Sequence, residues 1–222
     1  MTVATILITG ANRGIGLELC RQLVERGCTV NALCRRSSAE LNKLNVKVHE
    51  SYDVAGADAI ERFAATQAES SIDLLINNAG ILQSTSLDNL DLDSIRLQFE
   101  VNAIGPLRVT HSLLNALKPG AKVALITSRM GSIADNESGG SYGYRMSKAA
   151  LNAAGVSLAR DLKPREIAVT ILHPGYVSTD MTNHSGLINT TESAAGLLAR
   201  IDELTLATTG NFWHCNGEQL PW

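Results

Sequence analysis

Short apolar runs alternate with amphipathic stretches along almost all of this 222-residue sequence, and this alternation restricts the possible folds more than any other feature. The apolar runs, rich in Val, Ile and Leu, predict strands at residues 3–8, 29–33, 46–49, 74–76, 123–126 and 168–172. The intervening stretches have helical periodicity and predict helices at residues 15–26, 57–69, 92–117, 144–162 and 192–204.

The predicted strands are apolar throughout, which indicates that both faces of the sheet are covered. Alternation of strand and helix is typical of a parallel sheet wound right-handed. We therefore expect an α/β Rossmann fold: a doubly wound parallel sheet of about seven strands with helices on both faces, forming one domain over residues 1–222. Ligands of such sheets bind beyond the C-terminal ends of the strands, so functional residues are expected there.

Charge and cysteine content exclude several classes of protein. Nineteen Lys and Arg against 22 Asp and Glu give a formal net charge of -3, which argues against nucleic acid or a membrane surface as partner. The spacing of Cys20, Cys28, Cys34 and Cys215 indicates neither a metal site nor a disulfide framework. Residues 1–10 contain no basic leader, and their apolar run is too short for a signal or a membrane span. We expect a cytoplasmic protein.

A glycine-rich segment, TGANRGIG at residues 9–16, follows the first predicted strand and opens the first predicted helix. Glycines allow backbone N–H groups at a helix N-terminus to approach a pyrophosphate. The spacing is GxxxGxG, not the commoner GxGxxG, and glycines also serve plain turns, but the position favours dinucleotide binding. The predicted contacts in this segment are Gly10, Asn12, Arg13, Gly14, Ile15 and Gly16.

The residues after the second strand indicate which dinucleotide binds. NAD-binding sheets usually carry a carboxylate for the ribose about 20 residues beyond the glycine segment. Here that place holds Cys34, Arg35 and Arg36, and the next acidic residue is Glu40. Because a guanidinium pairs with the 2′-phosphate of NADP, we expect NADP(H) bound through Arg35, with Arg13 in support. The alternative is a pair of solvated arginines on an exposed turn.

Tyr144 and Lys148 are spaced i and i+4 at the start of a long predicted helix, which places them on one helical face. A phenol is a poor acid or base at neutral pH, and a neighbouring ammonium lowers its pKa. The pair can therefore exchange a proton with an alcohol or carbonyl oxygen. Ser128, at the end of the fifth predicted strand, can donate a hydrogen bond to the same oxygen.

Taken together, these motifs resemble those of the short-chain dehydrogenases/reductases over nearly the whole sequence. TGANRGIG, NNAG at 77–80, Ser128, YRMSK at 144–148 and HPGYVST at 173–179 occur in that family's order. Within the family, the sequence is most similar to the C-factor and sniffer-like carbonyl reductases. That similarity lies in SYGYRMSKAALN at 141–152 and in residues 210–222.

The resemblance implies further roles. It implies Asn102 as a fourth catalytic residue that holds a water next to Lys148, and Asp53 as the adenine contact. It also implies that Tyr144 and Lys148 contact the cofactor, and that helices carrying Asn102 and Tyr144 form a homodimer or homotetramer. The other cofactor contacts that it implies are Val54, Asn78, Ala79, Gly80, Pro174, Gly175, Val177 and Thr179.

The identity of the catalytic serine stays open. Ser128 precedes Tyr144 by more positions than is usual in the family, and Ser132, nearer to Tyr144, is a rival. Gly131 completes an SxxG arrangement with Ser128 that the family shows, which favours Ser128.

The expected function is NADPH-dependent reduction of an aldehyde or ketone to an alcohol, with a small-molecule substrate and no metal. NADP⁺-dependent oxidation of a secondary alcohol is an alternative because the chemistry is reversible. A cofactor-binding signalling protein of C-factor type is another alternative. The presence of Asn102, Ser128, Tyr144 and Lys148 together argues against it, because a binding protein needs no such set.

Overall fold

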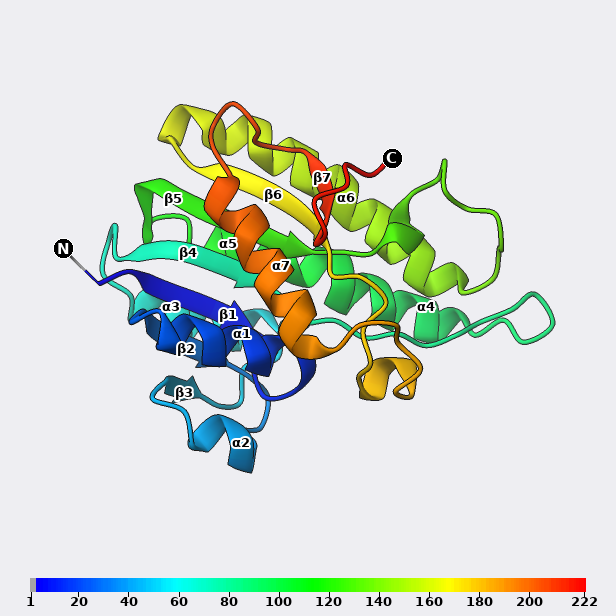
Figure 1. Cartoon of the computed structure of the whole chain (residues 1–222), viewed down its shortest axis with the longest axis horizontal. Helices are drawn as coiled ribbons and strands as arrows, with labels where there is room; N and C mark the ends of the chain where they lie inside the picture. Colours follow the sequence, from blue (N-terminus) through cyan, green and yellow to red (C-terminus); the bar gives the residue numbers. More distant parts are fainter. Residues whose placement is uncertain (1–2) are drawn as a thin grey trace.

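The computed structural model describes residues 3–222. The first two residues of segment 1–10, in which no leader is expected, lie outside the described residues. A single sheet of seven parallel strands runs through the molecule in the order β3-β2-β1-β4-β5-β6-β7 (Figure 1). The strands are β1 (Thr5–Thr9), β2 (Thr29–Leu33), β3 (Lys47–His49), β4 (Ile72–Asn77), β5 (Leu117–Ile126), β6 (Ala168–His173) and β7 (Phe212–His214). The expected doubly wound parallel sheet is therefore confirmed.

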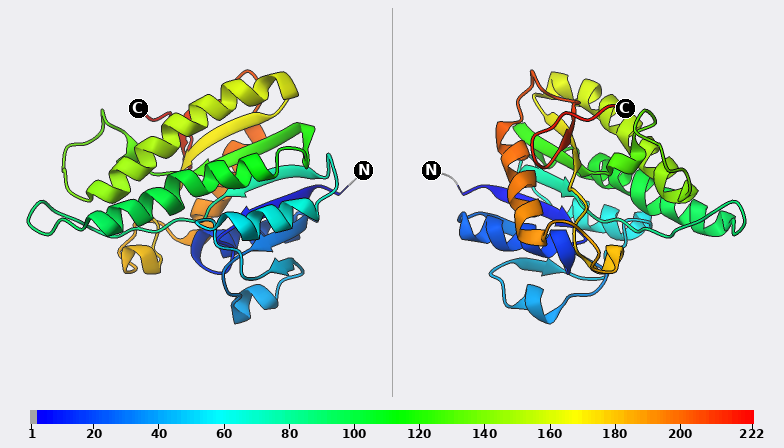
Figure 2. Two further views of the ribbon diagram at one scale, coloured as in Figure 1. Left: turned by 180° about the vertical axis from the view of Figure 1, so that it is seen from behind. Right: turned by 45° about the vertical axis from the view of Figure 1, so that its right-hand side comes forward.

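Helices cover both faces of the sheet. Two of them, α1 and α7, pack side by side on the face nearer the viewer in Figure 1. The opposite face, turned forward in the left view of Figure 2, is covered by α3, α5 and α6. The helices are α1 (Gly14–Glu25), α2 (Ala39–Asn42), α3 (Ala57–Ala65), α4 (Leu92–Phe99), α5 (Gly105–Ser112), α6 (Tyr142–Leu162) and α7 (Thr190–Glu203). Within residues 3–222, no helix combines the length and apolar character needed to cross a membrane.

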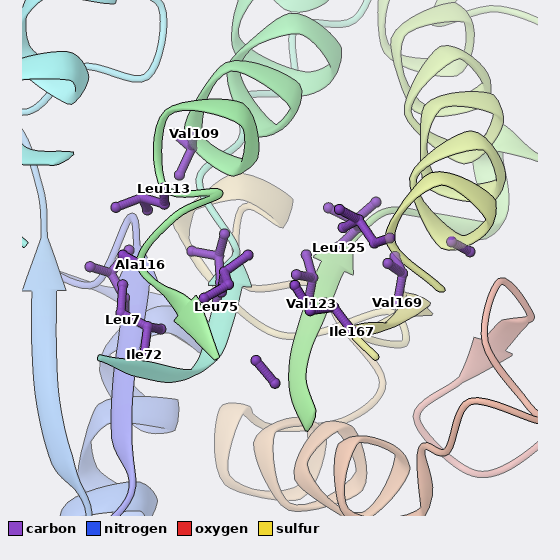
Figure 3. Close-up of a cluster of buried hydrophobic side chains, with 14 of the residues drawn as sticks. Leu7, Ile72, Leu75, Val109, Leu113, Ala116, Val123, Leu125, Ile167 and Val169 are labelled. Atoms are coloured by element: carbon purple, nitrogen blue, oxygen red, sulfur yellow. The ribbon is translucent and has the colours of Figure 1, made fainter. Parts of the chain in front are cut away.

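The strands bury side chains on both faces because successive residues of a strand point in opposite directions. In β1, Leu7 packs with Leu75 and Val109 in the cluster drawn in Figure 3. Its neighbours Ile6 and Ile8 join the second cluster, under α1 and α7. Each fully buried side chain of this kind contributes about 1.5–3 kcal/mol relative to an exposed one. The continuous apolar pattern of the strands thus has a direct structural cause.

The strand order reverses at β1, which pairs with β2 on one side and β4 on the other. Chains leaving β1 and β4 at their C-terminal ends turn to opposite faces of the sheet, and this leaves a crevice between them. Thr9 ends β1 and Asn77 ends β4, so the glycine segment and the NNAG motif face each other across that crevice.

The single helix expected over residues 92–117 is wrong. The structure forms α4, a π-helical turn η1 (Glu100–Ile104) and α5. Pro106 has no N–H to donate to a carbonyl four residues earlier, and the preceding Gly105 amide donates to Glu100, five residues earlier. The helix therefore has a wider turn, with one more residue, around Asn102. The apolar periodicity of the sequence continues through this turn and does not reveal it.

Other boundaries also differ from the sequence analysis. β5 begins at Leu117, where it pairs with Ile72, instead of at residue 123. The helix expected over 57–69 ends at Ala65. β7 was not located in the sequence because only three residues, Phe212–His214, pair with β6.

Candidate active site

A cavity of about 1000 Å³ opens at the C-terminal edge of the sheet. Its wall contains most of the residues that the sequence analysis selected. These are Gly10, Asn12, Arg13, Gly14, Ile15, Gly16, Arg35, Asp53, Val54, Asn78, Ala79, Gly80, Tyr144, Lys148, Pro174 and Thr179. Asn102, Ser128, Gly175 and Val177 are not part of the wall and lie behind or beside it.

The glycine segment forms a cradle that side chains would fill. Gly10 and Gly14 have φ angles of +66° and +54°, in the left-handed region that favours glycine. A Cβ on Gly10 would lie 2.8 Å from the Cα of Ala79, and a Cβ on Gly16 would collide with the carbonyl oxygen of Gly10. This close-packed, side-chain-free surface at the start of α1 fits the pyrophosphate of a dinucleotide.

The NNAG motif holds that cradle in place. The Asn78 side-chain amide donates to the carbonyl oxygens of Thr9 (3.1 Å) and Gly10 (3.0 Å). In return, the Thr9 hydroxyl accepts from the backbone amides of Asn78 and Ala79, each at 3.1 Å. The end of β4 thereby fixes the turn that follows β1.

Three arginines lie in the cavity wall near the predicted 2′-phosphate site. Arg35 and Arg36 are exposed, and across residues 3–222 neither forms an ion pair. The Asn12 side chain donates to the carbonyl oxygen of Arg36 at 2.9 Å, which joins the glycine segment to the end of β2. Arg13 instead pairs with Asp180, Nη1 to Oδ2, at 3.1 Å. Arg35 and Arg36 are thus available to an anion.

Asp53 and Val54 form the wall between β3 and α3. The Asp53 carboxylate accepts from the backbone amide of Ala55 at 3.0 Å. Val54 is buried against Gly105, and its carbonyl oxygen accepts from Arg108 at 2.6 Å. This turn is therefore held against α5, which begins directly after the π-helical turn that carries Asn102.

Tyr144 lines the cavity and is buried, with 8% of its surface exposed. Burial raises the pKa of Tyr144 to about 12, and a hydrogen bond from Ser128 opposes that rise. The Ser132 hydroxyl accepts instead from the backbone amide of Asp135 at 3.1 Å. The Ser128 hydroxyl likewise accepts from a backbone amide, that of Met130, at 3.2 Å. Of the two serines, Ser128 is the one whose hydroxyl affects the pKa of Tyr144.

Lys148 lies one helical turn further along α6, as the spacing predicts. Its Nζ is 5.8 Å from the centroid of the Tyr144 ring and donates to the carbonyl oxygen of Ile126 at 2.9 Å. Burial lowers the pKa of Lys148 to about 7. The lowering of the pKa of Tyr144 expected from Lys148 is wrong, because burial of the phenol raises that pKa.

Asn102 lies in the π-helical turn and its side chain bridges two elements. Its amide nitrogen donates to the carbonyl oxygen of Ile81 at 2.8 Å and to the Ser147 hydroxyl at 3.0 Å, while its oxygen accepts from the Ile81 amide at 2.8 Å. A Cβ on Gly80 would lie 3.3 Å from the Asn102 oxygen and 3.6 Å from Lys148 Nζ. Asn102 and Lys148 thus flank the same glycine.

The segment after β6 passes beside the glycine cradle. The Pro174 carbonyl accepts from Ser193 at 2.7 Å, and Gly175 turns the chain with a φ of +87°. Val177 is buried and forms a bridge with Ile188, which accounts for its absence from the wall. The Thr179 methyl lies 3.6 Å from where a Cβ on Gly14 would be, so the two loops are in contact range.

Two cavity residues with clear structural roles were not selected from the sequence. Thr9 is the last residue of β1, and nothing in the local sequence sets it apart. Only the fold shows that its hydroxyl accepts hydrogen bonds from two backbone amides of the NNAG motif. Asp180 directly follows HPGYVST, but its ion pair with Arg13 joins residues 167 positions apart, which no local pattern reveals.

Comparison with known protein families identifies the family of this chain. The model of the short chain dehydrogenase family matches residues 4–188. The chain belongs to the short-chain dehydrogenase family.

Two relatives are matched over nearly the whole of their own length. One is the 1-hydroxy-2-glutathionyl-2-methyl-3-butene dehydrogenase of Rhodococcus sp. (strain AD45), 40% identical over 99% of this chain and 100% of that protein. The other is the C-signal of Myxococcus xanthus, 43% identical over 72% of this chain and 98% of that protein.

Solved structures of short-chain dehydrogenases resemble the fold over its whole length. The carbonyl reductase Sniffer of D. melanogaster superposes with a TM-score of 0.91 at 30% identity, covering 100% of both chains. An NADPH-bound carbonyl reductase from chicken fatty liver gives a TM-score of 0.89 at 29% identity, also covering 100% of both. The expected similarity to C-factor and sniffer-like proteins is confirmed.

Proposed function

We propose that this short-chain dehydrogenase reduces an aldehyde or ketone to an alcohol with NADPH. The observation that carries the proposal is that Tyr144 and Lys148 line the same cavity as the glycine cradle, with Ser128 beside Tyr144. A binding protein needs the cradle alone. A buried phenol beside a lysine adds a group that can transfer a proton.

The residues of the cavity fit NADP(H) better than NAD(H). Gly10, Gly14 and Gly16 leave room for a pyrophosphate, and Arg35 offers an unpaired guanidinium where an NAD site would have a carboxylate. Asp53, the expected adenine contact, lines the same cavity. Solved relatives described as NADPH-bound and NADP-bound support the same choice.

When bound in this cavity, NADPH would supply the hydride for the carbonyl carbon. The Tyr144 hydroxyl donates its proton to the carbonyl oxygen, and the Ser128 hydroxyl donates a hydrogen bond to that oxygen as negative charge develops on it. Because the pKa of Tyr144 is about 12, its proton is present at neutral pH, which suits the reducing direction. The Lys148 ammonium and the Asn102 side-chain oxygen both lie close to Gly80, in the same part of the site.

Alcohol oxidation with NADP⁺ is the second candidate. It is supported by the Rhodococcus relative, which is named as a dehydrogenase and matches 99% of this chain. Oxidation requires Tyr144 to accept a proton, and the raised pKa of the buried phenol makes that step harder at neutral pH.

The test is cofactor turnover against small aldehydes, ketones, diketones and quinones, with Tyr144→Phe beside the natural protein. We expect NADPH consumption that exceeds NADH consumption and is lost in the Phe variant. Full turnover by Tyr144→Phe contradicts the assigned proton donor. Binding of NADPH without carbonyl turnover, together with NADP⁺ reduction by alcohols, favours the second candidate.

We also propose that the chain forms a homodimer or homotetramer through the helical segment that carries Asn102, formed by α4, η1 and α5, and through α6, which carries Tyr144. This is supported by the apolar side chains of Leu97, Ile104 and Leu107, each more than two-fifths exposed on these helices and the turn between them. Light scattering during gel filtration tests the assembly, and replacing Leu97 and Leu107 with Glu should yield a monomer.

A further inference from the structure

We infer that Asp180 sets the affinity for the cofactor by competing with a cofactor phosphate for the guanidinium of Arg13. The inference rests on the proposed binding of NADP(H) and adds a residue that the sequence analysis did not select. It makes Asp180 a residue that weakens cofactor binding, and Arg13 the cation through which it acts.

The geometry of the ion pair carries this inference. Arg13 lies in the glycine segment directly before α1, and its Nη1 is 3.1 Å from Asp180 Oδ2. Both residues belong to the cavity wall. The other carboxylate oxygen of Asp180 is 3.2 Å from Nε2 of His184, so the carboxylate is shared between two side chains. Arg13 is therefore already paired inside the site proposed for an anion.

The loop that carries Asp180 is held without help from Arg13. At its base the Ser178 amide donates to the carbonyl oxygen of Ile188 at 2.9 Å, and the Leu187 amide donates to that of Tyr176 at 2.7 Å. Figure 1 shows this loop in golden orange below α7. Among the described residues, Arg13 to Asp180 is the one side-chain hydrogen bond between the loop and the glycine segment. Loss of the ion pair should thus leave the loop in place.

The ion pair is exposed enough to exchange. The side chains of Arg13 and Asp180 are 64% and 61% exposed, and ion pairs of this kind are weak because solvent screens them. A phosphate accepts two charge-assisted hydrogen bonds from one guanidinium and displaces a single-contact carboxylate. Binding then loses the stabilisation of the ion pair. Removing the charge of Asp180 should tighten cofactor binding by about two- to fivefold.

The experiment measures dissociation constants for NADPH and NADH at low salt in the natural protein, Asp180→Asn, Arg13→Gln and the double variant. Nucleotide fluorescence gives the readout, so no turnover is needed. Asp202→Asn is the matched control: Asp202 is 62% exposed and pairs with Arg26 at 2.9 Å, away from the cavity. We expect tighter binding in Asp180→Asn, no change in Asp202→Asn, and a gain that high salt removes.

The double variant separates competition from simple repulsion. If Asp180 acts through Arg13, Asp180→Asn has no effect in the Arg13→Gln background. A gain that persists there, or no gain in the single variant, overturns the inference. A gain for NADPH alone assigns the 2′-phosphate as the competing group, and an equal gain for NADH assigns the pyrophosphate. If the natural protein binds neither nucleotide, the proposed function fails as well.

Discussion

The backbone of Gly131 lies directly against the backbone of Lys148. A Cβ built on Gly131 would be 2.7 Å from the carbonyl carbon of Lys148 and 2.9 Å from the nitrogen of Ala149. Gly131 ends the short helix η2 (Arg129–Gly131), which begins directly after Ser128. The SxxG spacing therefore has a steric cause: only a residue without a side chain lets the serine segment approach α6 this closely.

Gly131→Ala adds only a methyl group, but it should displace Ser128 and so disturb the proposed site. The added methyl cannot move aside because it faces backbone, so η2 must shift away from α6 and carry Ser128 with it. We expect a loss of about 1–3 kcal/mol in the free energy of unfolding and a larger fall in kcat than in cofactor affinity. Gly56→Ala is the control, since its Cβ would meet one atom at 3.6 Å. Equal effects of the two substitutions would contradict this explanation.

Separate substitutions of the two serines decide which one acts in the reaction. Each serine hydroxyl accepts from a nearby backbone amide, Ser128 from Met130 and Ser132 from Asp135. Only the Ser128 hydroxyl also opposes the rise in the pKa of Tyr144. Ser128→Ala should lower kcat by about a hundred- to a thousandfold, as for other lost donors to a developing oxyanion. Ser132→Ala should leave kcat close to the natural value and cost stability through the lost turn contact. The reverse ranking would assign the role to Ser132.

Arg35→Ala should weaken binding of NADPH and leave binding of NADH nearly unchanged. A charge-assisted hydrogen bond to the 2′-phosphate is worth about 1.5–3 kcal/mol, which corresponds to a change of about ten- to a hundredfold in Kd. Arg36→Ala is the matched control because Arg36 is also exposed and lies in the same wall. A similar loss for both nucleotides would show that Arg35 does not read the 2′-phosphate.

The fold was predictable because a strand that is buried on both faces has a continuous run of apolar residues. The continuous apolar run at Ile6–Ile8 reflects two covered faces, and that feature is local to the sequence. The π-helical turn at Asn102 was not predictable in the same way. It arises from Pro106 and the packing of α4 and α6, and the apolar periodicity continues through it. β7 depends on three residues that become a strand only by pairing with β6.

The candidate site was predictable where a motif lies on one element. Tyr144 and Lys148 share a helix, so their spacing alone places them together. The Arg13–Asp180 ion pair, in contrast, joins two loops that are neighbours only after the sheet has formed. The direction of the pKa shift of Tyr144 was also not predictable from the sequence. A phenol beside a lysine suggests a lowered pKa, but the depth of Tyr144 in the fold raises it.

The buried ammonium of Lys148 should make stability depend on pH above neutrality. Burial lowers its pKa to about 7, against an ordinary value of 10.5, so between these values the unfolded chain binds more protons than the folded one. The free energy of unfolding should therefore rise as pH increases through this window, by at most about 1.4 kcal/mol per pH unit. Below about pH 7, both states bind the proton and this contribution is constant.

Urea unfolding at several pH values between about pH 7 and 9 tests this dependence. The upper limit avoids the ordinary pKa of cysteine, because burial raises the pKa of Cys20 to about 12 and its contribution has the opposite sign above about pH 9. Lys148→Met keeps a side chain of similar length without the charge, and it should flatten the curve while raising stability at pH 7. A variant whose stability rises with pH as steeply as the natural protein would show that Lys148 does not lose its proton on folding.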